Sequence, residues 1–200
     1  DDYAATPAGV PTPCAIWNPA GIQVIVDNTH IQDCEIGCKL GVNPAVDTDY
    51  YNAAYPNDGD FNDFYFLNNS RYQVGSRGYV TTNARAFDVW QGNNFTVSNS
   101  TIYLNNNAPT PALSGQRVAR FNSPIFGSCT FTNNLVNFNS RADNAFDVVS
   151  GASVGKLQIS GNSFTGEVGY KNLVNVNASA TCVTVIGPDN DFSNPTHYGF

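Results

Sequence analysis

The sequence predicts an all-β protein built as a solenoid of stacked parallel strands. The stretch Ala145 to Thr165 (AFDVVSGASVGKLQISGNSFT) holds two alternating apolar runs, each followed by small polar residues. Alternation with a period of two indicates half-buried strands, and Gly, Ser and Asn between them indicate tight turns. The pattern recurs along the chain at spacings of roughly 20 to 30 residues, which is typical of solenoids. Asn supplies about one residue in seven, in keeping with many turns.

Two families of short runs define the expected coils. The first resembles Leu157 to Phe164 (LQISGNSF), and its other members are Phe95 to Ile102, Ile125 to Phe131, Ile25 to Ile31 and Val183 to Phe192. The second is a repeated short strand that starts at Phe64, Phe87, Phe121, Phe146 and Val174.

From this alignment the apolar residues of both runs should point into the solenoid. The predicted inward set is Phe64, Phe66, Phe87, Val89, Phe95, Val97, Ile102, Phe126, Phe131, Phe146, Val148, Ile159, Phe164, Val174, Val176 and Val185.

At these positions the chain resembles the right-handed parallel β-helix fold, which pectin-degrading enzymes, bacteriophage tailspikes and several virion surface proteins share. The resemblance covers roughly residues 21–194 and is specific for architecture rather than activity. It implies about six coils stacked about 4.8 Å apart. It also implies an internal corner column, with Asn side chains stacked as hydrogen-bonded ladders, read as Thr29, Ser100, Cys129, Asn162 and Asn190.

The predicted domain organisation is a single β-helix over residues 15–194, preceded by an extended arm at 1–14 and followed by a tail at 195–200. A Pro-rich leader without periodicity predicts the arm, and the run at 41–63 breaks the coil pattern and predicts a loop insertion. Trp17, just before the first coil, is expected to close the open end of the solenoid.

The charge balance disfavours some partners. The net charge is −7, and the nine basic residues look dispersed along the sequence, so binding to nucleic acid or an anionic membrane is not expected. No apolar run is long enough to span a bilayer. A virion surface or an extracellular setting is the expected location.

Metal sites are weakly indicated. Cys34 and Cys38 could form half of a zinc site, but no second pair of ligands has matching spacing. An odd count of five cysteines leaves Cys14 as the residue expected to bridge, to Cys34 or Cys38 or to another chain. No cofactor is therefore predicted, with calcium as the alternative: its oxygen ligands would be Asp58, Asp60, Asn62 and Asp63, in what is otherwise a solvated turn.

Four tyrosines, Tyr50, Tyr51, Tyr55 and Tyr65, are candidates for binding a glycan or a partner, because each offers a flat apolar face and a polar tip. The only candidate acids are Asp88 and Asp147. They fall in a predicted outward column with Tyr65, Asn122 and Asn175, two coils and thus roughly 10 Å apart. That distance is slightly longer than the distance between the two catalytic carboxyl groups of inverting glycosidases.

Two classes of function compete. The first, and the preferred one, is a structural or adhesive surface protein: a decoration, fibre or spike component of a bacteriophage virion, assembled as a trimer and without catalytic activity. The alternative is an extracellular enzyme or binding protein for polysaccharides, a lyase or a glycoside hydrolase. The weakly charged faces, the arm and the odd cysteine count favour the first.

Overall fold

The computed structural model describes residues 14–18, 23–42, 63–74, 84–90, 92–104, 116–122, 125–138, 142–165 and 170–192. In these residues all regular structure is β, in three sheets whose strands pair in parallel. Alternating apolar residues make each strand, and Asn or Gly with positive φ makes many of the turns between strands, as at Asn28, Asn99, Asn133 and Gly161.

Each sheet takes every third strand. Sheet A contains β1 (Cys14–Asn18), β4 (Ile36–Leu40), β7 (Arg85–Val89), β10 (Arg117–Phe121), β13 (Ala142–Val148) and β16 (Tyr170–Val176). Sheet B contains β2 (Gln23–Asp27), β5 (Asp63–Leu67), β8 (Asn94–Ser98), β11 (Ile125–Thr132), β14 (Ser153–Ser160) and β17 (Thr181–Ile186). Sheet C contains β3 (His30–Cys34), β6 (Arg71–Val74), β9 (Thr101–Leu104), β12 (Leu135–Phe138) and β15 (Ser163–Thr165).

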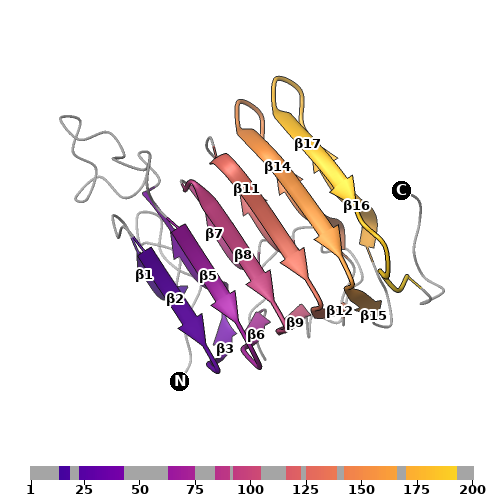
Figure 1. Cartoon of the computed structure of the whole chain (residues 1–200). Helices are drawn as coiled ribbons and strands as arrows, with labels where there is room; N and C mark the ends of the chain where they lie inside the picture. The colour runs from indigo at the N-terminus through magenta and orange to yellow at the C-terminus, as the bar shows by residue number, and fades with distance from the viewer. Residues whose placement is uncertain are drawn as a thin grey trace.

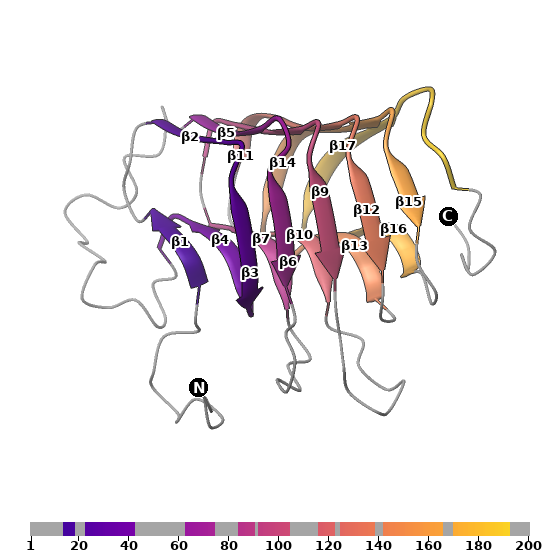
Figure 2. The same ribbon diagram turned by 90° about the horizontal axis from the view of Figure 1, so that it is seen from below.

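The chain therefore winds from sheet A to sheet B to sheet C and back, which makes a right-handed parallel β-helix. Figure 1 shows the strands of sheet B side by side from the indigo to the yellow end, and Figure 2 shows sheet C between the edges of the other two. Within the described ranges, five coils contain all three strands, and β16 and β17 form a sixth. This confirms the predicted fold class.

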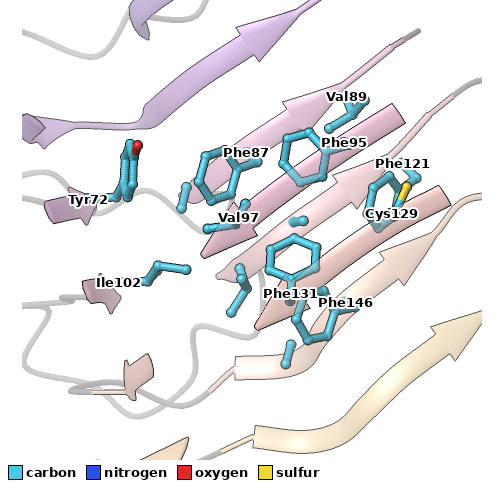
Figure 3. Close-up of a cluster of buried hydrophobic side chains, with 14 of the residues drawn as sticks. Tyr72, Phe87, Val89, Phe95, Val97, Ile102, Phe121, Cys129, Phe131 and Phe146 are labelled. Carbon is cyan, nitrogen blue, oxygen red and sulfur yellow. The ribbon is translucent and has the colours of Figure 1, made fainter. Parts of the chain in front are cut away.

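Aromatic side chains fill the interior of the coils. Phe66, Phe87 and Phe95 pack with ring centroids 4.9 to 5.6 Å apart, and Phe131 lies 4.6 Å from Phe146. Figure 3 shows Phe87, Phe95, Phe131 and Phe146 gathered between the sheets. Each fully buried Phe contributes about 1.5–3 kcal/mol relative to leaving it exposed.

The predicted inward set is confirmed at twelve positions, none of them more than 1% exposed: Phe64, Phe66, Phe87, Val89, Phe95, Val97, Ile102, Phe131, Phe146, Val148, Ile159 and Phe164. The side chain of Phe126 lies outside the described residues. Val174 is only partly buried but packs against the core. Val176 pairs with the buried Val148 and so shares its face, yet it is 41% exposed because β16 is the last strand of sheet A.

Val185 was predicted to point inward, and that is wrong. It pairs with the outward Gln158, whereas Ile186 pairs with the buried Ile159; Val185 is 39% exposed and Ile186 is 47% exposed, because β17 is the last strand of sheet B. The error is a slip of one residue in register, which moves every side chain of a strand to the other face. The strand β17 therefore directs Ile186, not Val185, toward the interior.

An asparagine ladder forms the corner between sheets B and C. The backbone N–H groups of Ser100, Asn134 and Asn162 each donate to the side-chain oxygen one coil further on, at 3.0 Å, and the last acceptor is Asn190. Cys129 is not part of this column. It pairs with Phe95 and Leu157 inside sheet B and is fully buried, and the corner position of its coil belongs to Asn134.

The predicted arm (except Cys14, which begins β1), most of the insertion and the predicted tail lie outside the described residues. Among the described residues no helix is both long and apolar enough to cross a membrane.

Candidate functional site on the outer face of sheet A

A column of charged side chains runs along the outside of sheet A. In register, one residue per strand, it consists of Lys39, Asp88, Arg120, Asp147 and Asn175, and we call it the sheet A column. Its members alternate with lumen residues, so they belong to the outer face. Even so, Asp88 is 1% exposed and Asp147 is 5% exposed. Charged residues are rarely this buried unless they are paired, so the column needs an explanation.

This column corrects the one expected from the sequence. Asp88 and Asp147 do lie two strands apart, but the residue between them is Arg120, and Asn122 follows β10. Tyr65 belongs to a different face, because it pairs with Ile25 and Thr96 in sheet B. The predicted alignment placed Phe121 opposite Phe87, but Phe121 pairs with Val89, a shift of two residues.

Asp88 is the most heavily bonded side chain of the column. Arg85 Nε lies 2.7 Å from Asp88 Oδ1, and Arg85 Nη2 donates to Oδ2 at 3.0 Å. Trp90 Nε1 also donates to Oδ2 at 3.0 Å, and Asn122 Nδ2 donates to Oδ1 at 2.8 Å. Burial opposes ionisation, but the charge of Arg85 and these hydrogen bonds outweigh it and hold the pKa of Asp88 below its ordinary value.

Asp147 has a similar set of donors. Arg117 Nε donates to its Oδ2 at 3.0 Å. Asn175 Nδ2 and Asn177 Nδ2 donate to its Oδ1 at 2.8 and 3.1 Å. The two carboxylates of the sheet A column therefore have the same design: one arginine and at least one asparagine from a corner just beyond a strand.

Arg120 lies between these two carboxylates but is not their hydrogen-bonded partner. Its Nε is buried and has no hydrogen-bond partner among the described residues. Burial lowers the pKa of Arg120, and the positive charges of Arg85 and Arg117 lower it further, while Asp88 and Asp147 act in the opposite direction. Three guanidinium groups thus meet on this face, although their residues look dispersed along the sequence.

Both tryptophans of the chain belong to the same side of the molecule. Trp17 continues the register of the sheet A column beyond Lys39, whose Nζ lies 4.9 Å from the centroid of its ring. Trp17 therefore points outward and does not close the solenoid, contrary to expectation, because its neighbour Ile16 takes the inward position opposite Cys38. Trp90 directly follows β7 and remains half-buried.

The other predicted site residues are not brought to this face. Tyr65 is half-buried on the outer face of sheet B, and Tyr50, Tyr51 and Tyr55 lie outside the described residues. Of the calcium candidates only Asp63 is described; Asn94 Nδ2 donates to it at 3.0 Å. Asp58, Asp60 and Asn62 lie outside the described residues, so the calcium site stays a prediction.

The thiols of the first coils are close enough to influence one another. Burial raises the pKa of Cys38 well above its ordinary value, and Cys34 and Cys14 add to that rise. Over the described part of the chain, however, no three His, Cys, Asp or Glu side chains are grouped so that they could hold a metal ion.

The sheet A column is thus arranged to hold charge in place. A general acid needs a pKa near the working pH, but the surroundings of Asp88 stabilise its ionised form. A signal for Arg120 was present in the sequence: RVARF at 117–121 ends on an apolar residue, as RAFDV at 85–89 does, and aligning those ends pairs Arg120 with Asp88. Comparison of the chain with protein-family models, with curated proteins and with solved structures found no match.

Proposed function

We propose that this chain is a non-catalytic structural or adhesive module of a surface assembly, with a virion as the foremost candidate. A parallel β-helix is a stiff post, because each coil is hydrogen-bonded to the next along all three sheets. Its role would be to present a surface at a fixed distance from the particle.

The non-catalytic part of the proposal depends on one observation: the carboxylate oxygens of Asp88 are already bound by neighbouring side chains. A carboxylate offers about four lone-pair sites. Arg85 Nη2, Trp90 and Asn122 donate three hydrogen bonds to Asp88 at 2.8 to 3.0 Å, and Arg85 Nε adds an ion-pair contact at 2.7 Å. A carboxylate in this state is a poor proton donor and has little capacity left for a substrate or a water molecule. This favours binding over proton transfer.

The assembly part is supported by the outer face of sheet B. Its central column runs through Ile25, Tyr65, Thr96, Thr130, Gln158 and Val185 and carries no charge. At its two ends Ile25 is 60% exposed and Val185 is 39% exposed. A neutral column with exposed aliphatic side chains at its ends suits packing against neighbouring copies, for which we propose a trimer.

The first experiment is analytical ultracentrifugation of the full chain and of a chain lacking Asp1 to Pro13. We expect a trimer, with attachment to the particle lost when the arm is removed. A monomer in both forms, with no affinity for a particle surface, would contradict the assembly role.

The second experiment incubates the protein with acidic and neutral polysaccharides and measures reducing and unsaturated ends. We expect no release above a heat-denatured control. Release would establish the alternative function, a polysaccharide-degrading enzyme, and Asp88→Asn and Asp147→Asn would then show whether the sheet A column is responsible.

A further inference from the structure

We infer that the sheet A column contains a binding site for a singly charged oxyanion, the carboxylate or sulfate group of an acidic sugar, centred on Arg120. This inference rests on the adhesive half of the proposed function and names the chemistry of its ligand. Four features of the described residues support it: the balance of charges, a hydrogen-bond donor of Arg120 that has no acceptor among those residues, the partial exposure of the site and the tryptophan beside it.

Around the centre of the column, Arg85, Arg117 and Arg120 accompany two carboxylates, which leaves one positive charge over; Lys39, at the end of the column, lies against the ring of Trp17. Arg85 is paired with Asp88, and Arg117 is paired with Asp147. Arg120 lies between these two pairs, one strand from each carboxylate. Its own charge is therefore the excess, in a chain whose net charge is −7. Holding a cation here without a bonded anion makes the site attractive to an anion from outside.

The hydrogen-bond donors of Arg120 also favour the binding of an anion from outside the protein. Its Nε–H is buried and has no partner among the described residues. A buried charged donor without a partner is unfavourable, and such groups are rare in folded proteins unless a ligand, an ion or water completes them. Asp88 is already engaged, because it accepts three hydrogen bonds and forms an ion pair with Arg85. The Nε atom itself has almost no exposed surface, so a ligand would meet the outer N–H groups of the guanidinium, which match the two oxygens of a carboxylate or sulfate.

The site remains reachable from solvent. Asp88 and Asp147 are almost completely covered, but Arg117, Arg120, Asn122 and Trp90 each keep part of their surface exposed. The carboxylates thus form the base that fixes the arginines. The exposed parts of Arg120 and its neighbours form the surface that a ligand would meet.

The rim of the site suits a sugar. Trp90 is held by its hydrogen bond to Asp88, so its ring has a fixed place beside the column. An indole ring offers an apolar face on which a sugar ring can stack. A single excess charge matches a carboxylate or a sulfate monoester better than a phosphate monoester, which carries nearly two charges at neutral pH.

The test uses tryptophan fluorescence of the full-length protein, because both tryptophans lie beside the column. The probes are glucuronate and glucose 6-sulfate, with glucose as the neutral control and inorganic phosphate as the doubly charged one, all at constant ionic strength. We expect a saturable change with one or both acidic sugars and none with glucose. A response to phosphate as strong as to the acidic sugars would overturn the assignment of a singly charged ligand.

Three variants locate the site. Arg120→Gln should weaken binding of the acidic sugar by about tenfold or more, since it removes a charge-assisted hydrogen bond. Arg120→Lys, which keeps the charge but loses the fork, should weaken it less. Lys156→Gln removes a charge from an exposed position on sheet B and should leave binding unchanged. Binding by Arg120→Gln with wild-type affinity would overturn the inference.

If Arg120→Gln does not fold, the Nε–Hε signal of Arg120 in the NMR spectrum of the wild-type protein gives the answer directly. It should shift saturably with the acidic sugar, and no shift there would refute the site. The outcome is separable from the test of catalysis. If the protein binds the acidic sugar and also releases new sugar ends from polysaccharides, the binding site is supported and the non-catalytic role is refuted. If it neither binds the sugar nor releases ends, only the binding site is refuted.

Discussion

Replacing Asp88 by Asn tests how the outer face of sheet A is held together. The substitution keeps the shape of the side chain and removes its charge. Arg85, only 8% exposed, would then lose its ion pair with Asp88, and two donors would face the new amide N–H₂. Breaking a buried ion pair by removing one partner costs about 3–5 kcal/mol. Because the new amide oxygen can still accept from Trp90 or Asn122, we expect about 3 kcal/mol.

That loss is large beside the total stability of about 5–15 kcal/mol that is usual for folded domains. For a chain of this length it corresponds to a fall in the melting temperature of about 6–12 °C. The assay is urea and thermal unfolding at pH 7, with Asp63→Asn as the control. Asp63 is half-buried on sheet B and accepts one hydrogen bond, from Asn94, so its replacement should cost about 1 kcal/mol or less.

The pH dependence of the free energy of unfolding tests the role of Asp88 in a second way. The pKa of Asp88 is lowered in the folded state, so the unfolded chain takes up its proton first as the pH falls, and the wild-type protein loses stability through that range. Asp88→Asn has no such loss. The gap between the two proteins should be full at pH 7 and should narrow as the pH falls toward about 2. An Asp88→Asn protein as stable as the control at pH 7, with the pH dependence of the wild type, would refute this account.

Three further substitutions test the coils themselves. Ile159→Asp should abolish folding, because it places an unpaired charge in the core, whereas Val185→Asp on the outer face should fold normally by circular dichroism; the reverse result would restore the sequence-based register. Asn162→Ala should lower the free energy of unfolding by about 3 kcal/mol, because buried backbone groups of the ladder lose their partners, and a loss under about 1 kcal/mol would mean that water replaces it. Gly161→Ala should destabilise more than Gly151→Ala: both have positive φ, but only at Gly161 would the new methyl group meet the side chain of Asn133, and equal losses in urea unfolding would count against that contact.

The architecture was predictable because its signals are local. Period-two alternation and small polar corners occur within a single coil, and repetition along the chain then implies stacking. The twelve confirmed core residues belong to runs in which a large apolar residue occupies every second position. The separation of Asp88 and Asp147 by two strands followed from the repeat in the same way.

The composition of the candidate site was harder to predict, because it depends on register between coils. Phe121 resembles Phe87 in sequence but pairs with Val89. Because of this shift of two residues, the sequence alignment put Asn122 in the position opposite Asp88 that Arg120 occupies. The prediction of Cys129 at a corner fails for a similar reason: the alignment of Ile125 to Phe131 with Leu157 to Phe164 sets Phe131 level with Phe164, whereas Phe131 pairs with Val97 and Ile159 of sheet B. Register is fixed by the Asn ladder and by contacts between strands about 30 residues apart, which no single coil contains.

The alternation of charge along sheet A also limits how such a protein can change length during evolution. Lys39, Asp88, Arg120 and Asp147 alternate in sign from one coil to the next, so the charge pattern repeats every two coils although the backbone repeats every one. Deleting the coil that carries Arg120 would set two aspartates on adjacent strands, about 4.8 Å apart, where like charges repel. Duplications or deletions of two coils would preserve the alternation. Natural variants of this solenoid should therefore differ from it by even numbers of coils in this region.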